Sequence, residues 1–307
     1  MVSTKKLWVL ALLTMAVYLK GFAQIRPSQS LYAYNTMYVN PANTGILGKG
    51  SVFVWHRSQW VGFPGGPNTE MLAFEYPLKK VAFGLNAFYD HNNIVRQTHV
   101  SGYFSYLLNM SDNVFLSLGL NFGMENTGLD PSALNVKDSG ESFFDGSTSA
   151  LGLVGGIGAT LYSGTWYVGI SSPNILPHKV LATNASVATV QQFPLYFSSG
   201  VDVSLSYTIH WRPSLLMYYG EQLPFGFELT SNFIFKDKLL TGISYRFDSA
   251  YILHLGYKFS ENFSLGYAFD WDAHELRRYD YGSHELFLRF EFDTRSERVR
   301  FQSPRFF

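Results

Sequence analysis

The sequence contains no cysteine, few charged residues and no long apolar run beyond its N-terminal segment. Without cysteine there is no disulfide framework, no thiolate metal site and no cysteine nucleophile. Charged residues make up 15 % of the 307 residues, whereas a soluble domain averages about 25 %. The formal net charge of zero argues against a nucleic-acid-binding protein. No later stretch reaches the roughly 18 consecutive apolar residues of a transmembrane helix.

Aromatic residues, in contrast, are abundant, at 17 % of the chain, and apolar residues reach 47 %. A soluble β-sandwich or barrel is also rich in Tyr and Phe, but its water-facing exterior needs more Lys and Glu than this chain has. Aromatic residues form girdles at the two interfaces of an outer-membrane barrel. The composition therefore favours a surface that faces lipid.

The N-terminus has the features of a secretory signal peptide. Lys5 and Lys6 precede an apolar core, Leu7–Leu19, and small residues follow up to Ala23. This order of charge, apolar core and small residues predicts cleavage after Ala23. Because Gln24 rather than Cys would then be first, we expect no lipoprotein processing.

The C-terminal third alternates in polarity with the period of a β-strand. Between residues 263 and 271 the apolar side chains Phe263, Leu265, Tyr267, Phe269 and Trp271 alternate with Ser264, Gly266, Ala268 and Asp270. Successive side chains of a strand point to opposite faces, so one face is apolar and the other is small or polar. The ranges 251–259 and 285–292 repeat the pattern. Alternating segments of roughly ten residues are typical of transmembrane β-barrels.

The same alternation along the whole chain predicts an all-β fold, an outer-membrane β-barrel of about 14 antiparallel strands, an even number as single-chain bacterial barrels have. The strands are expected at 51–59, 69–76, 81–90, 97–108, 114–124, 149–161, 165–171, 193–205, 208–218, 225–235, 239–247, 251–259, 263–271 and 282–293. Long loops are expected at 125–148 and 172–192. The domain organisation is then a signal peptide (1–23), an irregular N-terminal segment (24–50), the barrel (51–293) and a tail (294–307). Glycines on inner faces, such as Gly84 and Gly119, would either ease curvature of the strands or make room in the lumen.

Three blocks resemble the PorP/SprF family of type IX secretion proteins. The first, residues 29–45, reads Gln-Ser-Leu-Tyr-Ala-Tyr-Asn-Thr-Met-Tyr-Val-Asn-Pro-Ala-Asn-Thr-Gly. The second, residues 57–69, contains Arg-Ser-Gln-Trp-Val-Gly-Phe before a Gly/Pro turn, with Gly66 where Ala is commoner in the family. The third, residues 276–285, ends in Tyr-Asp-Tyr-Gly-Ser-His-Glu, and the last five residues also resemble the family's ending.

The resemblance implies an outer-membrane protein that works in the surface delivery of large adhesins, including gliding adhesins. It implies as partners the C-terminal domain of a secreted adhesin, the type IX translocon and periplasmic ring proteins, besides outer-membrane lipid; no nucleic acid is expected. The positions that match the family blocks, and are our candidates for partner binding, are Asn40, Pro41, Arg57, Gln59, Trp60, Gly62, Phe63, Tyr279, Gly282, Ser283, His284 and Glu285. The alternative function is a diffusion channel for small solutes.

Two groups of polar residues suggest chemistry, and each has a simpler interpretation. The His and carboxylate residues between Asp270 and Glu285 are metal-ligand types, but they lack the His-Glu-x-x-His geometry, and a rim loop with ion pairs explains them. Ser244, His254 and Ser264 fall on inner faces, but no Gly-x-Ser-x-Gly elbow accompanies them. We therefore expect no enzyme, no metal and no cofactor.

Two blocks have alternative structural interpretations. The segment from Gln59 to Pro67 is either a shaped surface for a partner, with Trp60 and Phe63 as contacts, or a hairpin turn with an aromatic anchor at the membrane interface. Both can hold. The segment 40–43 is a plug, a periplasmic latch or a turn that leads into the first strand.

Overall fold

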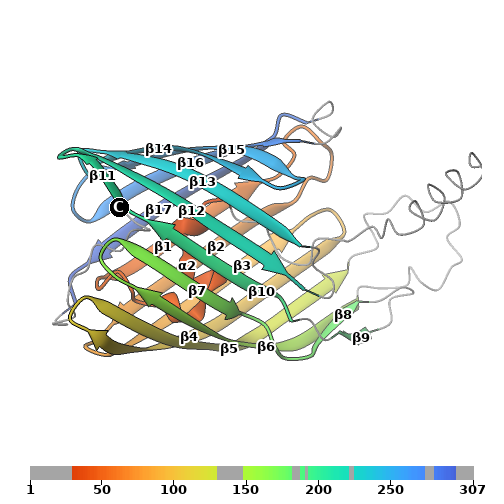
Figure 1. Ribbon diagram of the computed structural model, residues 1–307. Helices are drawn as coiled ribbons and strands as arrows, with labels where there is room; N and C mark the ends of the chain where they lie inside the picture. The colour runs from red at the N-terminus through yellow and green to blue at the C-terminus, as the bar shows by residue number, and fades with distance from the viewer. Residues whose placement is uncertain are drawn as a thin grey trace, which may run out of the picture.

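The computed structural model describes residues 30–129, 148–181, 187–190, 193–220, 225–273 and 280–294. Its main body is a closed barrel of 14 antiparallel wall strands (Figure 1). The predicted signal peptide, its cleavage site and the tail beyond residue 294 lie outside the described residues. Within the described residues, no helix combines the length and apolarity needed to cross a membrane.

The wall follows the order of the chain, with one small hairpin outside it. The strands are β1 (Gly50–Ser58), β2 (Asn68–Pro77), β3 (Val81–His91), β4 (Val95–Ser111), β5 (Val114–Leu129), β6 (Thr148–Tyr162), β7 (Trp166–Ser172), β8 (His178–Leu181), β9 (Val187–Val190), β10 (Leu195–Val201), β11 (Val203–Ser206), β12 (Ile209–Tyr219), β13 (Gly226–Phe235), β14 (Leu239–Arg246), β15 (Ala250–Lys258), β16 (Phe263–Asp272) and β17 (Ser283–Phe292). β8 and β9 pair only with each other, and β10 and β11 together form one wall strand because both pair with β12.

The barrel closes where its first and last strands meet. β1 pairs with β17 from Gly50↔Phe292 to Ser58↔His284. On the opposite side, β10 pairs with both β7 and β12. Every wall strand therefore has a neighbour on each side, which closes the sheet, as hydrocarbon cannot satisfy an open backbone edge. The predicted fold class is confirmed.

Side chains alternate between lipid and lumen as the sequence predicts. In β15, Leu253 is 53 % exposed and Leu255 is 48 % exposed, whereas His254 between them is 4 % exposed. β16 repeats this alternation, with Leu265 outward and Gly266 inward. In a membrane the outward side chains face lipid, which explains why so many large apolar groups lie on the outside.

The lumen is filled by the N-terminal segment, which we call the plug and define as residues 30–46. It forms three short helices, η1 (Tyr32–Tyr34), α2 (Thr36–Val39) and η2 (Pro41–Asn43), drawn in orange-red between the walls in Figure 1. Met37 and Ala42 are fully buried. The sequence predicted an irregular segment here because helices of three or four residues leave no periodic pattern; contacts with the wall stabilise them instead.

Inner-wall glycines provide the space for the plug. A Cβ at Gly84 would lie 2.3 Å from Met37 Sδ, and one at Gly119 would lie 2.2 Å from the backbone nitrogen of Ala42. Three wall hydroxyls then donate to plug carbonyls: Ser105 to Thr44, Ser117 to Ala42 and Ser171 to Val39, at 2.6–2.8 Å.

The two ends of the barrel differ. One end, the short-turn end, has tight connections such as 78–80, 112–113 and 236–238. The other, the long-loop end, has the connections 130–147 and 173–194. In bacterial barrels short turns face the periplasm and long loops face outward. The plug chain runs between these ends, because Lys49 precedes β1 at the short-turn end and Ser30 lies near the long-loop end.

Both predicted long loops contain strand residues that were not expected. β5 continues to Leu129, and β8 and β9 form a hairpin inside the range 172–192 at the long-loop end (Figure 1). Apolar alternation ends near Met124, where the predicted strand stopped, and β8 and β9 have only four residues each. Backbone pairing does not need that alternation once the strand has left the membrane, so the ladder between β4 and β5 extends into polar sequence.

Candidate functional site

The site begins with a compact turn at the long-loop end, which we call the outer turn and define as residues 59–67. Gln59 N donates to Pro67 O at 2.9 Å, and Phe63 N donates to Trp60 O at 2.9 Å. Gly62 and Gly65 have φ angles of +91° and +82°, values that glycine adopts without a steric penalty. The Phe63 side chain is 44 % exposed. The glycines thus allow a tight turn that presents an aromatic group to its surroundings.

The outer turn packs against the chain that leads into β17. Val61 N donates to Gly282 O at 2.9 Å, and Tyr281 N donates back to Val61 O at 2.7 Å. Trp60 N donates to Ser283 Oγ at 3.2 Å. A Cβ on Gly62 would lie 2.6 Å from the Tyr281 ring. Two blocks that the sequence analysis identified separately therefore form one surface.

Tyr281, which is 76 % exposed at this surface, was not among the candidates from the sequence. Its position between Tyr279 and Gly282 in a candidate block was the signal available. Tyr279 lies outside the described residues. Gln59 and Trp60 are half-buried at the base of the turn.

Directly beneath the outer turn lies a buried ionic cluster. Arg57 and Glu285 are register partners in β1 and β17, and their side chains form an ion pair. Arg57 Nη1 also lies 2.9 Å from Asp270 Oδ2. Arg57 is 4 % exposed and Glu285 is 1 % exposed. Both were candidates for partner binding, and their side chains are buried on the lumen side of the wall.

This cluster holds the first described residue of the plug. Ser30 N donates to Glu285 Oε1 at 2.7 Å, and Ser30 Oγ donates to Asp270 Oδ2 at 2.6 Å. Arg246 Nη2 donates to Ser30 Oγ at 2.8 Å, while Arg246 Nε donates to Glu228 Oε2 at 2.8 Å. We call Ser30, Arg57, Arg246, Asp270 and Glu285 the anchor. Buried charges are tolerated when they are paired and hydrogen-bonded, as these are.

Arg246 and Glu228 were not candidates from the sequence. Alternation alone places both on the inner face of their strands, and an inward charge in a barrel that holds a plug needs a partner. Alternation does not reveal which inward charges meet, because that depends on strand register.

Asn40 and Pro41 belong to the plug. Asn40 Oδ1 accepts from Ala42 N at 3.0 Å and its Nδ2 donates to Thr160 Oγ1 at 3.0 Å. Pro41 begins η2. Of the alternatives for this block, the structure supports the plug, because both residues are buried within the lumen.

His284 and Glu285 point to opposite faces of β17. His284 Nδ1 lies 2.6 Å from the hydroxyl of Tyr267 on the outer face, whereas the Glu285 carboxylate faces inward. Asp270 and Glu285 are already engaged by arginines. Among the residues that the structure describes, no group of three or more His, Asp or Glu side chains is arranged to hold a metal ion.

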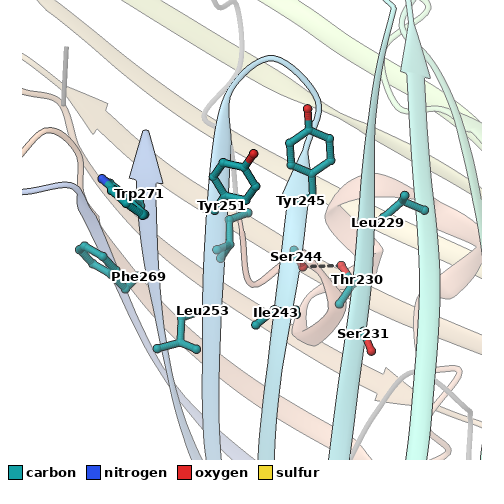
Figure 2. A pocket seen from close by; sticks show the side chains of 11 residues that line it. Leu229, Thr230, Ser231, Ile243, Ser244, Tyr245, Tyr251, Leu253, Phe269 and Trp271 are labelled. Carbon is teal, nitrogen blue, oxygen red and sulfur yellow. Dashed lines mark hydrogen bonds between the residues drawn. The ribbon is translucent and has the colours of Figure 1, made fainter. Parts of the chain in front are cut away.

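The outer wall has an apolar hollow near the long-loop end, over β13 to β16 (Figure 2). Outward side chains of Ile243, Tyr251 and Trp271 line it, and Figure 2 shows the hydrogen bond between Thr230 and Ser244 on the inner side. Ser244 Oγ also lies 2.7 Å from His254 Nε2. The hollow therefore faces lipid, while this polar pair is buried behind the wall.

These features define a class of protein, an outer-membrane β-barrel whose lumen is plugged by its own N-terminal segment. The family model described as type IX secretion system membrane protein PorP/SprF matches residues 21–290. The chain belongs to the PorP/SprF family and is an outer-membrane component of the type IX secretion system.

Solved structures share the fold at low sequence identity. A TodX deltaS2S3 mutant monoaromatic hydrocarbon channel is 11 % identical, with a TM-score of 0.53, over 85 % of this chain and 94 % of that one. A Pseudomonas aeruginosa FadL homologue is 12 % identical, with a TM-score of 0.51, over 88 % and 95 %. The CymD monoaromatic hydrocarbon channel is 13 % identical, with a TM-score of 0.50, over 85 % and 93 %. No curated protein shows a significant match.

Proposed function

We propose that the barrel docks or delivers secreted cell-surface adhesins, of the gliding type, through the outer turn and the adjoining Tyr281. The observation that carries this proposal is that two family-like blocks, distant in sequence, form a single exposed surface with fixed backbone hydrogen bonds. Rigid presentation lowers the ordering cost of binding. Exposed aromatics such as Phe63 and Tyr281 are good contact residues.

The proposed partner is the folded C-terminal domain of the adhesin. A cargo domain that has crossed the outer membrane meets the long-loop end, where the outer turn lies. The short-turn end faces the periplasm, and we propose that the translocon and periplasmic ring proteins contact it there.

The plug favours docking over the alternative of a diffusion channel. Residues 30–46 occupy the lumen, and buried plug residues such as Met37 contact the wall closely. The channel structures named above share only the fold. We also propose that the protein is not an enzyme; in support, Ser244 bonds both Thr230 and His254 on the buried inner wall.

A double variant, Trp60→Ala with Phe63→Ala, tests the docking role. We expect normal barrel assembly but loss of adhesin display at the cell surface, measured by antibody labelling of intact cells. The matched control is Tyr219→Ala with Phe225→Ala, which removes two exposed aromatics between β12 and β13, also at the long-loop end but outside the outer turn, and should leave display unchanged. Wild-type display by the first variant would remove the role of the outer turn.

Deletion of the protein tests the secretion role itself. We expect a deletion strain without a paralogue to lose one or a few adhesins from its surface while nutrient uptake stays normal. Unchanged display, together with stepwise conductance of the purified protein in planar bilayers, would favour the diffusion channel instead.

A further inference from the structure

We propose that the outer turn and the plug are mechanically linked through the β1–β17 pair, so that displacing the outer turn loosens the plug. The link runs through consecutive residues. Arg57 lies two positions before the outer turn begins at Gln59, and Glu285 lies two positions after Ser283, which bonds Trp60. The strand pair that carries the exposed surface therefore also carries the anchor.

The anchor responds sharply to small shifts because its groups are charged and buried. Glu285 uses both carboxylate oxygens: Oε1 accepts from Ser30 N, and Oε2 accepts from Leu31 N at 2.9 Å and from Trp55 Nε1 at 3.1 Å. If β17 moves relative to the plug, the Glu285 carboxylate separates from these donors, and in this buried place water does not supply replacement hydrogen bonds. Buried polar groups left without partners are costly, so the anchor favours one seated arrangement over intermediate ones.

The middle of the plug is held by weaker contacts, while at its other end Gly45 N donates to the buried carboxylate of Glu75 at 2.5 Å. The hydrogen bonds from Ser105, Ser117 and Ser171 to plug carbonyls join neutral groups, and hydrogen bonds to ionised groups are roughly twice as strong as neutral ones. The plug therefore depends more on its end near the outer turn than on its middle. At that end, the paired backbone bonds between Val61 and residues 281–282 make the outer turn and the start of β17 move together.

A single-cysteine reporter measures this link in a chain that has no cysteine of its own. Ala42→Cys places a thiol at a fully buried plug position, and a charged maleimide labels it only when the plug leaves its seat. The rate is measured on the purified mature protein in detergent, with no partner present. Folding is checked by heat-modifiable migration in gels.

Two test variants are combined with the reporter. Ser30→Ala removes the hydroxyl that contacts Asp270, Arg246 and Arg57. Ser283→Ala removes the bond to Trp60 and leaves the anchor intact. We expect each to raise the labelling rate at least tenfold, which corresponds to about 1.4 kcal/mol. Ser30→Thr, which keeps the hydroxyl, and Ser163→Ala in a turn at the short-turn end are the controls and should label at the wild-type rate.

The proposal is overturned if either Ser30→Ala or Ser283→Ala labels at the wild-type rate, since the first tests the anchor and the second tests transmission from the outer turn. It is also overturned if Ser30→Thr labels as fast as Ser30→Ala, because the hydroxyl would then be irrelevant. No adhesin enters this measurement. Failure of the proposed link between the outer turn and the plug is therefore distinguishable from failure of the docking proposal, on which it does not depend and which is tested by surface display.

Discussion

At the scale of the residue, two glycines on paired strands show how a lumen filled by its own chain constrains side-chain size. Gly119 faces the plug, and an added Cβ would lie 2.2 Å from the backbone nitrogen of Ala42. Gly102 faces outward, and its nearest neighbour to an added Cβ would be Phe122 O at 3.9 Å. An added methyl group would therefore clash with the plug at Gly119 but be accommodated at Gly102.

We expect Gly119→Ala to lower the free energy of unfolding by about 1–3 kcal/mol, as overpacking does. Gly102→Ala should change it by less than about 1 kcal/mol, and in the stabilising direction, because alanine restricts the unfolded chain. Urea unfolding of both variants in lipid vesicles measures the difference. Equal effects would show that the plug does not press on this part of the wall.

At the scale of the element, the wall strands were predictable, whereas a plug was one of three interpretations of residues 40–43 and its helices were not predicted. Alternation specifies both the existence and the outward face of a strand such as β16, because lipid and lumen impose opposite demands every second residue. The helices of the plug are too short for periodicity to reveal. For the site, the sequence indicated the outer turn and the start of β17 separately. Their contact, and the meeting of Arg57 with Ser30, depends on barrel closure, which local pattern does not encode.

Replacing Leu265 with Arg tests the outward face of β16. Leu265 faces lipid, and arginine there costs about 2–4 kcal/mol if the site lies at the bilayer midplane, whereas near the interface the cost falls to about 0–1 kcal/mol. Phe259→Arg, at the short-turn end of the neighbouring hairpin, is the matched control. Unfolding in lipid vesicles should separate the two variants, and the face assignment is wrong if Leu265→Arg is as stable as wild type.

At the scale of the whole molecule, the barrel and its predicted leader imply a processed outer-membrane protein. We expect the mature chain to begin at Gln24, because small residues up to Ala23 follow the apolar core of the leader. N-terminal sequencing of protein from the outer-membrane fraction checks this. Recovery of Met1 on the mature protein, or fractionation with soluble periplasmic proteins, would contradict it.

The pairing of β1 with β17 also has a consequence for biogenesis. All other neighbours in the wall are consecutive wall strands, with only the β8–β9 hairpin inserted between β7 and β10, whereas these two strands are separated by the whole barrel. Arg57 and Glu285 come together only when β1 pairs with β17, and only then does the backbone nitrogen of Ser30 gain the Glu285 carboxylate as its acceptor. Closure of the barrel and enclosure of the N-terminal segment are therefore the same event. The last strand to be synthesised, β17, completes the binding site for the N-terminal segment of the mature chain.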